Sequence, residues 1–220
     1  MRVYLINLEA PSQGGPAEAL RHPTCSGPAS ISEFTHRITP VHRHQSATEL
    51  ALTPTEIEGP YYRIGSPRRG SLIEPGISGT RLLLTGRVFN ERAVPIPGAV
   101  LDFWQSDDEG NYDMVGYLLR GNVVTDESGN YKLETIVPAC YEPREARHIH
   151  VKVQAVSRPY TTQLYFSDDA NRTRDEFYKP ELEVQVEDAP DGGRRGRFDF
   201  VIKQVTEKEN VTAASLAARV

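Results

Sequence analysis

Two runs in the middle of the chain decide the fold class: Leu82-Leu83-Leu84-Thr85-Gly86-Arg87-Val88-Phe89 and Ala99-Val100-Leu101-Asp102-Phe103-Trp104-Gln105. Both are short, apolar, and enriched in β-branched and aromatic residues, and a turn-like stretch at 90–98 separates them. Runs of this length that are bounded by Gly and Pro are typical of β-strands. Their spacing predicts that the two strands pair as a hairpin.

The β pattern continues toward the C-terminus. Asp126-Glu127-Ser128-Gly129 is a strong turn signal, and the stretch 130–136 after it alternates apolar and polar residues. We expect further strands at 147–155, 161–166, 182–187 and 197–205, a connecting loop at 64–80, and a solvated hairpin turn at Arg194-Arg195-Gly196-Arg197. Short strands without convincing helices between them predict an all-β fold, an antiparallel β-sandwich of about seven or eight strands with few short helices.

Chain length favours one folded domain, because 220 residues are few for two full cores. Residues 1–50 mix Pro, Gly, Ser and charged residues without a period, so we predict an irregular N-terminal arm. The predicted β-sandwich domain covers 51–206, and 207–220 form a C-terminal tail with a short helix near 213–219.

Composition excludes several functional classes. The formal charge of −5 gives no basic footprint for nucleic acid, and no apolar run approaches the ~20 residues of a membrane helix. The first residues lack a signal-peptide core. Two cysteines, Cys25 and Cys140, are too few for a disulfide scaffold, although one bridge between them stays open. We therefore expect a cytoplasmic protein that binds neither nucleic acid nor membrane.

The motif His148-Ile149-His150 begins a β-branched run. Residues i and i+2 of a strand share a face, so both imidazoles project together while Ile149 points to the other side. Such a pair suits one metal ion, but taken alone it is better explained by two hydrogen-bonded histidines of a polar face. His42-Arg43-His44 repeats the pattern without a surrounding strand, and we interpret it as solvent-facing.

Tyrosines near the histidine pair favour the metal interpretation. Tyr141 precedes the pair and Tyr112 lies further upstream. A phenolate is a hard anionic donor, and because free tyrosine titrates near 10 it needs a strong Lewis acid to bind at neutral pH. Two tyrosines with two histidines therefore point to Fe(III) over Zn(II) or Mg(II).

From about Thr53 to Phe166 the chain resembles the non-haem ferric intradiol ring-cleavage dioxygenases, the family of catechol 1,2-dioxygenase and protocatechuate 3,4-dioxygenase. The motifs occur in the family's order. They are Glu58-Gly59-Pro60-Tyr61-Tyr62, Leu101-Asp102-Phe103-Trp104-Gln105, Gly110-Asn111-Tyr112, Thr125-Asp126-Glu127-Ser128-Gly129-Asn130-Tyr131, Tyr141, His148-Ile149-His150 and Thr161-Thr162-Gln163-Leu164-Tyr165-Phe166. Each motif is weak alone, whereas the ordered set is specific.

By this resemblance one Fe(3+) per chain is bound by Tyr112, Tyr141, His148 and His150, and Tyr141 is the ligand that the substrate displaces. The family's catalytic arginine has two candidates. Counting from Tyr141 selects Arg144 and counting from His148 selects Arg147; we prefer Arg144, because Arg147 neighbours a ligand in the strand and should leave by the opposite face.

The resemblance also assigns substrate contacts and a reaction. Gln163 matches the glutamine that lines the pocket, and Tyr61 and Tyr62 are expected to contact the substrate. The implied activity is cleavage of a catechol-type diol by O2 between its two hydroxylated carbons, which gives a muconate-type dicarboxylic acid. Which catechol is used stays open, and a homo-oligomer stays possible.

Two alternatives come from other functional classes. The stretches 84–100 and 125–131 also resemble small transthyretin-like sandwiches that act as non-catalytic binding modules, and fold alone does not separate the two. A Zn(II) hydrolase or isomerase would use the histidines but has no need of two phenolates. The four-residue donor set favours the dioxygenase over both.

Overall fold

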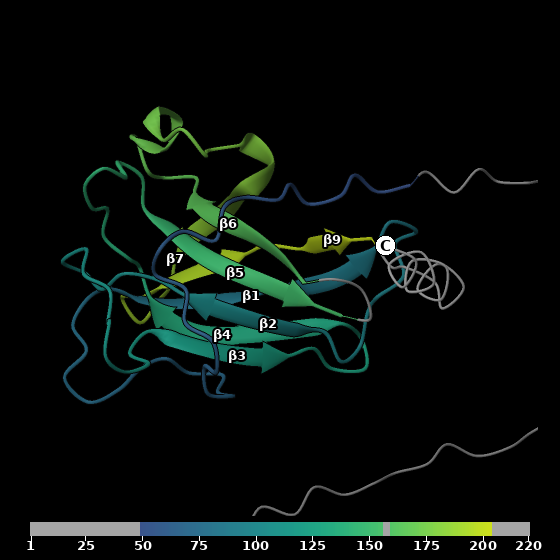
Figure 1. Cartoon of the computed structure of the whole chain (residues 1–220), viewed down its shortest axis with the longest axis horizontal. Coiled ribbons are helices and arrows are strands. Elements are labelled where there is room, and N and C mark those ends of the chain that lie inside the picture. The colour runs from purple at the N-terminus through teal and green to yellow at the C-terminus, as the bar shows by residue number, and fades with distance from the viewer. Residues whose placement is uncertain (1–48, 156–158, 204–220) are drawn as a thin grey trace, which may run out of the picture. The chain divides into compact units, whose positions relative to one another are not determined.

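The computed structural model describes residues 49–155 and 159–203, and every structural statement below concerns these residues. They form nine strands and two short 3-10 helices (Figure 1), which confirms the predicted all-β fold. The elements are β1 (Arg81–Asn90), β2 (Val100–Trp104), β3 (Arg120–Val124), β4 (Asn130–Ile136), β5 (His148–Gln154), β6 (Tyr160–Phe166), η1 (Arg172–Arg174), η2 (Pro180–Leu182), β7 (Glu183–Asp188), β8 (Arg194–Arg197) and β9 (Phe200–Ile202).

Hydrogen bonds link the strands in the order β3-β2-β5-β6-β7-β8-β1-β4, and β9 joins β1. The path folds so that β2 and β5 face β1 and β4 across one hydrophobic core, where the rings of Phe103 and Tyr131 lie 6.0 Å apart. Three pairings are parallel: β6 with β7, β1 with β8, and β1 with β9. The sheet is therefore mixed, whereas the sequence led us to expect antiparallel pairing throughout.

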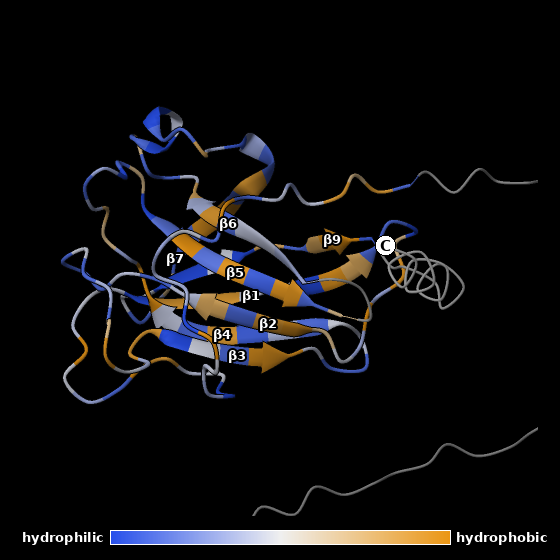
Figure 2. Cartoon of the chain, viewed as in Figure 1, coloured by the Kyte–Doolittle hydropathy of each residue, from blue (hydrophilic) through white to orange (hydrophobic). Residues whose placement is uncertain are grey.

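Alternation along the strands explains the layering (Figure 2). In β4, Tyr131, Leu133 and Thr135 are buried while Lys132 and Glu134 are exposed. Full burial of a leucine such as Leu133 contributes about 1.5–3 kcal/mol relative to leaving it in water. The predicted turn before β4 is confirmed, since Asp126 Oδ1 accepts hydrogen bonds from the backbone NH groups of Ser128 and Asn130 at 2.9 and 2.8 Å.

The predicted hairpin between 82–89 and 99–105 is wrong. β1 pairs with β4, β8 and β9, and β2 pairs with β3 and β5. The stretch 90–98 is a turn-rich connection between the two layers of the sandwich: Ile96 NH donates to Val88 O at 2.8 Å and Gly98 NH donates to Thr125 O at 3.2 Å. Both strands were located correctly from their apolar runs, but their partners lie elsewhere in the chain.

The arginine cluster at 194–197 is strand β8, and the prediction of a hairpin turn there is also wrong. β8 lies between β7 and β1, so both of its backbone edges are paired. The turn precedes it, where Ala189 NH donates to Gly193 O at 2.8 Å. Gly196 packs inward, since a Cβ there would lie 2.9 Å from Val184 Cγ1, while Arg194 donates to Asp168 at 2.9 Å on the polar side.

Several predictions fall on segments whose structure is not described. These are most of the N-terminal arm, the C-terminal tail with its short helix, the His42-Arg43-His44 motif and Cys25. In 49–155 and 159–203, no helix has the length and apolarity needed to cross a bilayer. β3 was not predicted, because only Val123 and Val124 of its five residues are apolar.

The segment before β1 crosses the edges of three strands. Thr53 NH donates to Val201 O, Glu56 NH to Thr161 O, and Asn122 NH to Pro67 O, each at 2.9 Å. These bonds attach 53–67 to β9, β6 and β3. The Tyr61-Tyr62 motif in its middle is thereby held against β5 and β2, at the place where the histidine motif begins.

Candidate metal centre

Four aromatic donors meet at one end of the sandwich. Tyr112 comes from the β2–β3 loop, Tyr141 from the β4–β5 loop, and His148 and His150 from β5. Ring centroids are 5.4 Å apart for Tyr112 and Tyr141, 5.6 Å for Tyr141 and His148, and 4.9 Å for the two histidines. The structure therefore brings together all four residues that the sequence singled out.

Strand geometry fixes the histidines. Ile149 between them is buried in the core, as the alternation predicts. His148 donates from Nδ1 to the carbonyl oxygen of Ala146 at 2.8 Å, which leaves Nε2 as the nitrogen with a free lone pair. His150 lies opposite Trp104 in the β2–β5 register, and the two rings stack at 4.9 Å with an interplanar angle of 10°.

Three buried donor atoms of this cluster have no hydrogen-bond partner among the described residues: Tyr112 Oη, His148 Nε2 and His150 Nδ1. Buried polar atoms without a partner are rare and cost about 1–3 kcal/mol each. Coordination to a metal ion would give such atoms a partner. Within the described part of the chain, His, Cys, Asp and Glu form no group of three that could bind a metal, so a metal ion at this cluster would need the tyrosines as donors.

Burial keeps the four donor side chains uncharged when no metal is bound. It lowers the pKa of His148 to about 4, with a further contribution from the Arg144 charge, and it lowers the pKa of His150 well below the ordinary value. Burial also raises the pKa of Tyr112 and of Tyr141. At neutral pH the imidazoles are therefore uncharged donors, whereas the phenols lose their protons only to a strong cation.

The two tyrosine loops lie directly against each other. A Cβ at Gly110 would lie 2.5 Å from Cys140 O, so only glycine fits where the Tyr112 loop meets the Tyr141 loop. Gly110 also has a φ of 89°, in the left-handed region that glycine adopts readily. Tyr141 itself begins a tight turn in which its NH donates to Arg144 O at 3.0 Å.

Tyr61 and Tyr62 face different surroundings. The Tyr61 ring stacks on Tyr112 at 4.3 Å and meets Tyr141 edge-on at 5.7 Å, so Tyr61 belongs to the cluster. Tyr62 contacts the ring of Trp104 at 4.8 Å and donates to Asp102 at 3.3 Å. The Tyr62 ring is thus separated from the four donors by Trp104, which itself stacks on His150.

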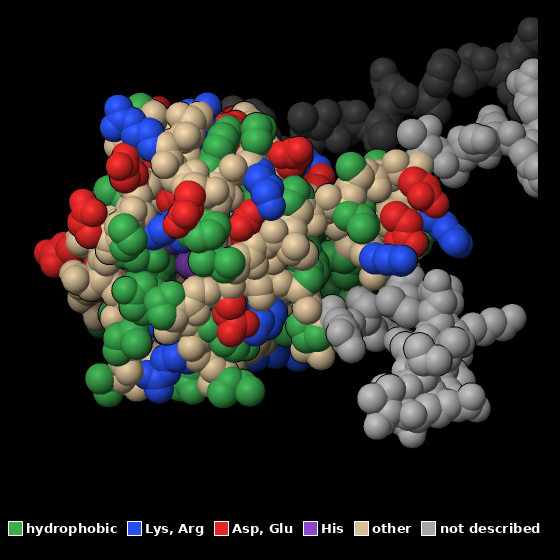
Figure 3. Space-filling view, turned by 45° about the horizontal axis from the view of Figure 1, so that its top comes forward, with side chains coloured by type: hydrophobic (Ala, Val, Ile, Leu, Met, Phe, Trp, Pro, Cys, Tyr) green, Lys and Arg blue, Asp and Glu red, His purple; other side chains and the backbone are tan. Residues whose placement is uncertain are grey.

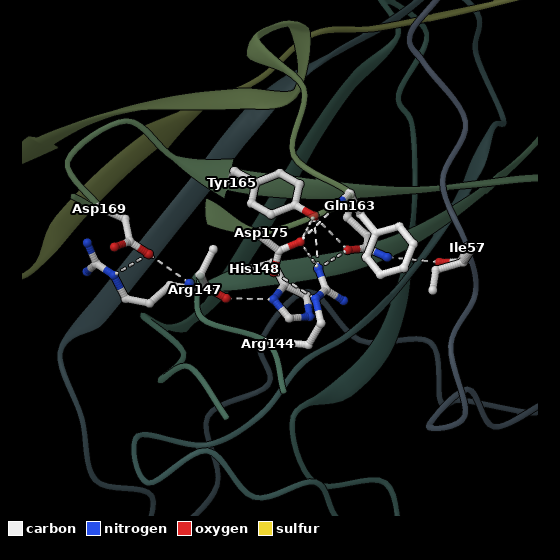
Figure 4. Close-up of polar contacts among 10 residues, drawn as sticks. Ile57, Arg144, Arg147, His148, Gln163, Tyr165, Asp169 and Asp175 are labelled. Carbon is white, nitrogen blue, oxygen red and sulfur yellow. Dashed lines mark hydrogen bonds and ion pairs between the residues drawn. The ribbon is translucent and has the colours of Figure 1, made fainter. Parts of the chain in front are cut away.

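A buried polar network extends from the cluster (Figure 4). Arg144 donates from Nε and Nη2 to the two carboxylate oxygens of Asp175 at 2.7 and 2.9 Å. The same Nη2 lies 2.6 Å from Gln163 Oε1 and 2.9 Å from Tyr165 Oη. Gln163 in turn donates from Nε2 to the backbone oxygen of Ile57 at 3.0 Å.

Arg147 points away from this network (Figure 4). Its backbone NH donates to Asp169 at 2.8 Å, and its guanidinium donates to Asp168 at 3.1 Å. The guanidinium also lies 5.5 Å from the ring of Phe166. Of the two arginine candidates, Arg144 is therefore the one that shares contacts with Gln163.

Little of the centre is exposed. A small histidine patch is visible in the space-filling view (Figure 3), and the histidines of the described residues are His148 and His150, each 1% exposed. Arg120 stabilises the edge of this site, donating to Tyr61 O at 2.6 Å and to Asp113 O at 2.9 Å.

Sequence reasoning did not assign a role to four contributors to this region. Trp104 and Tyr165 were recognised only as parts of family motifs. They lie opposite His150 and His148 in the β2–β5 and β5–β6 registers, on the histidine face of the sheet. Arg120 carried no signal beyond its charge, and Asp175 lies in an acid-rich stretch without a period. The positions of these groups depend on which strands and loops meet in the fold.

Comparisons with known proteins agree with this geometry. The family model described as Dioxygenase matches residues 57–204. A chlorocatechol 1,2-dioxygenase from Rhodococcus opacus is 30% identical over 172 residues, covering 61% of this chain and 67% of the relative. A catechol 1,2-dioxygenase from Acinetobacter baylyi is 31% identical over 168 residues, covering 62% of this chain and 53% of the relative.

A solved structure is more similar in sequence. The dioxygenase domain of a dioxygenase carbohydrate-binding protein fusion from Streptomyces sp. SirexAA-E has a TM-score of 0.68 and 43% identity, covering 70% of this chain and all of that domain. The match therefore covers about half to two thirds of the length of these two curated relatives, and the whole length of the Streptomyces dioxygenase domain.

Proposed function

Because this chain belongs to the intradiol ring-cleavage dioxygenase family, we propose that it cleaves a catechol-type diol with O2 between the two hydroxyl-bearing carbons. The product is a muconate-type dicarboxylic acid, and both oxygen atoms of O2 enter it. The observation that carries the proposal is the packing of the four donor rings, whose neighbouring centroids lie 4.9 to 5.6 Å apart and whose buried His148 Nε2 and His150 Nδ1 have no hydrogen-bond partner in the described residues. A passive sandwich module has no use for such a set, whose desolvation cost would be uncompensated.

The proposed cofactor is one Fe(III) bound by Tyr112, Tyr141, His148 and His150. The donors fit, because two phenolates and two neutral imidazoles offset most of the charge of a hard trivalent ion. Bound Fe(III) would supply a Lewis acid that holds both diol oxygens and withdraws electron density from the ring. A Zn(II) site, in contrast, would not favour two tyrosines.

Tyr141 is the donor that we propose the substrate displaces. Its loop continues into the exposed residues Glu142 and Pro143, whereas His148 and His150 lie on a strand that is paired on both edges. As a phenolate, the Tyr141 oxygen would be a base beside the bound diol and would accept one of its protons.

Arg144 and Gln163 are proposed to act on the substrate ring. Arg144 is buried with a full positive charge close to both histidines, so it stabilises negative charge that develops on the diol ring. Gln163 lies opposite His150 in the β5–β6 register and fixes one wall of the pocket through its bond to Ile57. Tyr61, stacked on Tyr112, forms another wall.

The proposed substrate class rests on the ring-cleavage reaction of the family, and not on a side chain that would recognise a particular ring substituent. Named relatives act on catechol, chlorocatechol and hydroxyquinol, and for this chain we propose a small aromatic ortho-diol of the same kind. We further propose that the protein is cytoplasmic.

The test combines metal, colour and product. Iron-loaded protein should be red to burgundy from phenolate-to-iron charge transfer, contain one iron per chain, and consume one O2 per catechol with formation of a muconate-type acid identified by mass. Colourless protein with stoichiometric zinc, or iron-loaded protein that cleaves no member of a catechol panel, would contradict the proposal.

A further inference from the structure

We propose that Asp175 is the positioning residue that holds Arg144 in its catalytic orientation. The inference rests on the proposed function and adds to it a residue from the β6–β7 connection. Asp175 follows η1 and is far from the iron-binding motifs in sequence. Its carboxylate is bonded to Arg144 and Tyr165 and to none of the four proposed ligands, so its role is to orient Arg144 and not to contact substrate.

The pairing between Arg144 and Asp175 is bidentate and buried. Nε and Nη2 of Arg144 each donate to a different carboxylate oxygen, at 2.7 and 2.9 Å, and the exposed fractions of the two side chains are 9% and 1%. Two parallel bonds of this kind fix the plane of a guanidinium, which a single bond would leave free to rotate. The Phe177 ring, 4.9 Å from the guanidinium carbon, restricts the same plane from its face.

Asp175 is itself held in place. Its Oδ1 accepts a hydrogen bond from Phe177 NH at 3.1 Å and lies 3.2 Å from Tyr165 Oη. The surrounding connection is secured by Arg172, which donates to Glu183 at 2.6 Å and to Asp169 O at 2.9 Å. The carboxylate is therefore a rigid support, as positioning requires.

One nitrogen of Arg144 remains for a ligand. Nε is bonded to Asp175, and Nη2 is bonded to Asp175, Gln163 and Tyr165. Nη1 has no hydrogen bond to any residue in the described ranges, and it is not among the fully buried unpartnered atoms. By occupying the other two nitrogens, Asp175 selects Nη1 as the donor that faces a bound diol.

The experiment compares Asp175→Asn with Asp169→Asn in the iron-loaded full chain. Asp169 is a matched control, since it is also a buried aspartate of the β6–β7 connection but bonds Arg147. We expect Asp175→Asn to lower kcat about 10–100-fold with iron content and KM nearly unchanged. Asp169→Asn should keep kcat within about threefold, and Asp175→Glu should recover part of the loss.

A second measurement needs neither iron nor turnover. In the NMR spectrum of the metal-free protein, the Nε–H signal of Arg144, assigned with Arg144→Lys, should exchange slowly with water and disappear or shift in Asp175→Asn. Fast exchange in the wild-type protein would overturn the inference even where the asparagine variant fails to fold.

The outcomes separate the two proposals. A wild-type chain that cleaves no catechol contradicts the proposed function. A wild-type chain that cleaves catechol, together with an Asp175→Asn variant of unchanged kcat or a loss equal to that of Asp169→Asn, overturns only the positioning role.

Discussion

Arg144 and Arg147 are separated by two positions and have opposite surroundings. Arg144 is buried and paired with the buried Asp175, whereas Arg147 is bonded to partly exposed Asp168. Exposed pairs contribute about 0–1 kcal/mol, while removing one partner of a buried pair costs about 3–5 kcal/mol. The same substitution at the two positions should therefore have very different effects.

We predict that Arg144→Ala lowers kcat about 100–1,000-fold, because one electrostatic donor to the developing charge is lost. Iron content should fall much less than kcat. Arg147→Ala is the matched control and should stay within about threefold of the wild type. Steady-state oxygen uptake and iron per chain measure both, and a large kcat effect at Arg147 alone would reverse the assignment of the arginine.

For Tyr141→Phe we expect retained iron and loss of most turnover. The ring and its contacts with Tyr61 and His148 remain, but the oxygen that leaves the metal and takes the diol proton is gone. Tyr62→Phe removes a tyrosine oxygen that bonds Asp102 instead, and it should keep nearly full activity. Full activity in Tyr141→Phe would show that another tyrosine is the displaced ligand.

The carboxyl of Asp175 should make stability depend on pH. Burial raises its pKa, but the hydrogen bonds and charge of Arg144 outweigh burial, and the pKa lies below the ordinary value. A depressed folded-state pKa contributes stability that is present above about pH 4 and is lost as the pH falls through the folded value. In urea unfolding, the stability difference between wild type and Asp175→Asn should be large at pH 7 and shrink below pH 4; a constant difference would contradict this.

β1 is the strand on which the second layer depends, because β4 lies on one edge and β8 and β9 share the other. Its only glycine, Gly86, lies where β8 gives way to β9. A Cβ at Gly86 would lie 1.7 Å from Phe198 O and 2.7 Å from Phe198 C, which are backbone atoms. The crossover from β8 to β9 is therefore possible only with glycine at this point of β1.

We predict that Gly86→Ala destabilises the domain by about 3 kcal/mol or more, through overpacking against the backbone. Gly70→Ala is the control, since the nearest atom to its Cβ would be Lys132 O at 3.8 Å, and it should change stability by less than about 1 kcal/mol. Chemical unfolding of the two variants measures the difference. Equal unfolding midpoints for the two variants would show that the backbone of the β8–β9 crossover can shift to accept a Cβ at Gly86 with little loss of stability.

The whole domain should respond to metal, since the four donors come from two loops and one strand that are adjacent only in the folded state. A ligand that binds only the folded chain stabilises it by mass action. Iron-loaded protein should therefore melt several degrees higher than protein stripped by a chelator, and Tyr112→Phe should reduce the gain. An unchanged Tm after complete iron removal would contradict a site built from these residues.

Local patterns in the sequence predicted the positions of most strands, but they could not predict which strands pair. Alternation within a run such as Tyr131, Leu133 and Thr135 is a property of neighbouring residues, so β4 was found with its turn. The choice of partner strand is not a local property. β1 pairs with β8, which lies more than a hundred residues away, and no residue near Leu82 indicates this pairing. The charged β8 was mistaken for a turn because its long side chains leave by the polar side while Gly196 packs inward.

Some residues of the candidate site could likewise be predicted from local sequence, whereas others could not. His148 and His150 could be placed on one face from strand period alone, and Tyr112 and Tyr141 came from the ordered family motifs. Asp175 could not be found, because its neighbours Arg174 and Glu176 are charged too and only the tertiary fold brings it to Arg144. Electrostatic support of this kind depends on burial, which a charged stretch does not reveal.

The pairing of Leu82 with Arg194 also means that β1 is synthesised well before its partner strand β8. At about 5–20 residues per second, a ribosome completes β1 roughly ten seconds before it delivers β8. During that interval β4 can already pair with β1, but the other edge of β1 has no partner. Open strand edges attract other chains. The growing polypeptide is therefore most exposed to aggregation, and most in need of a chaperone, between the release of β4 and the arrival of β8.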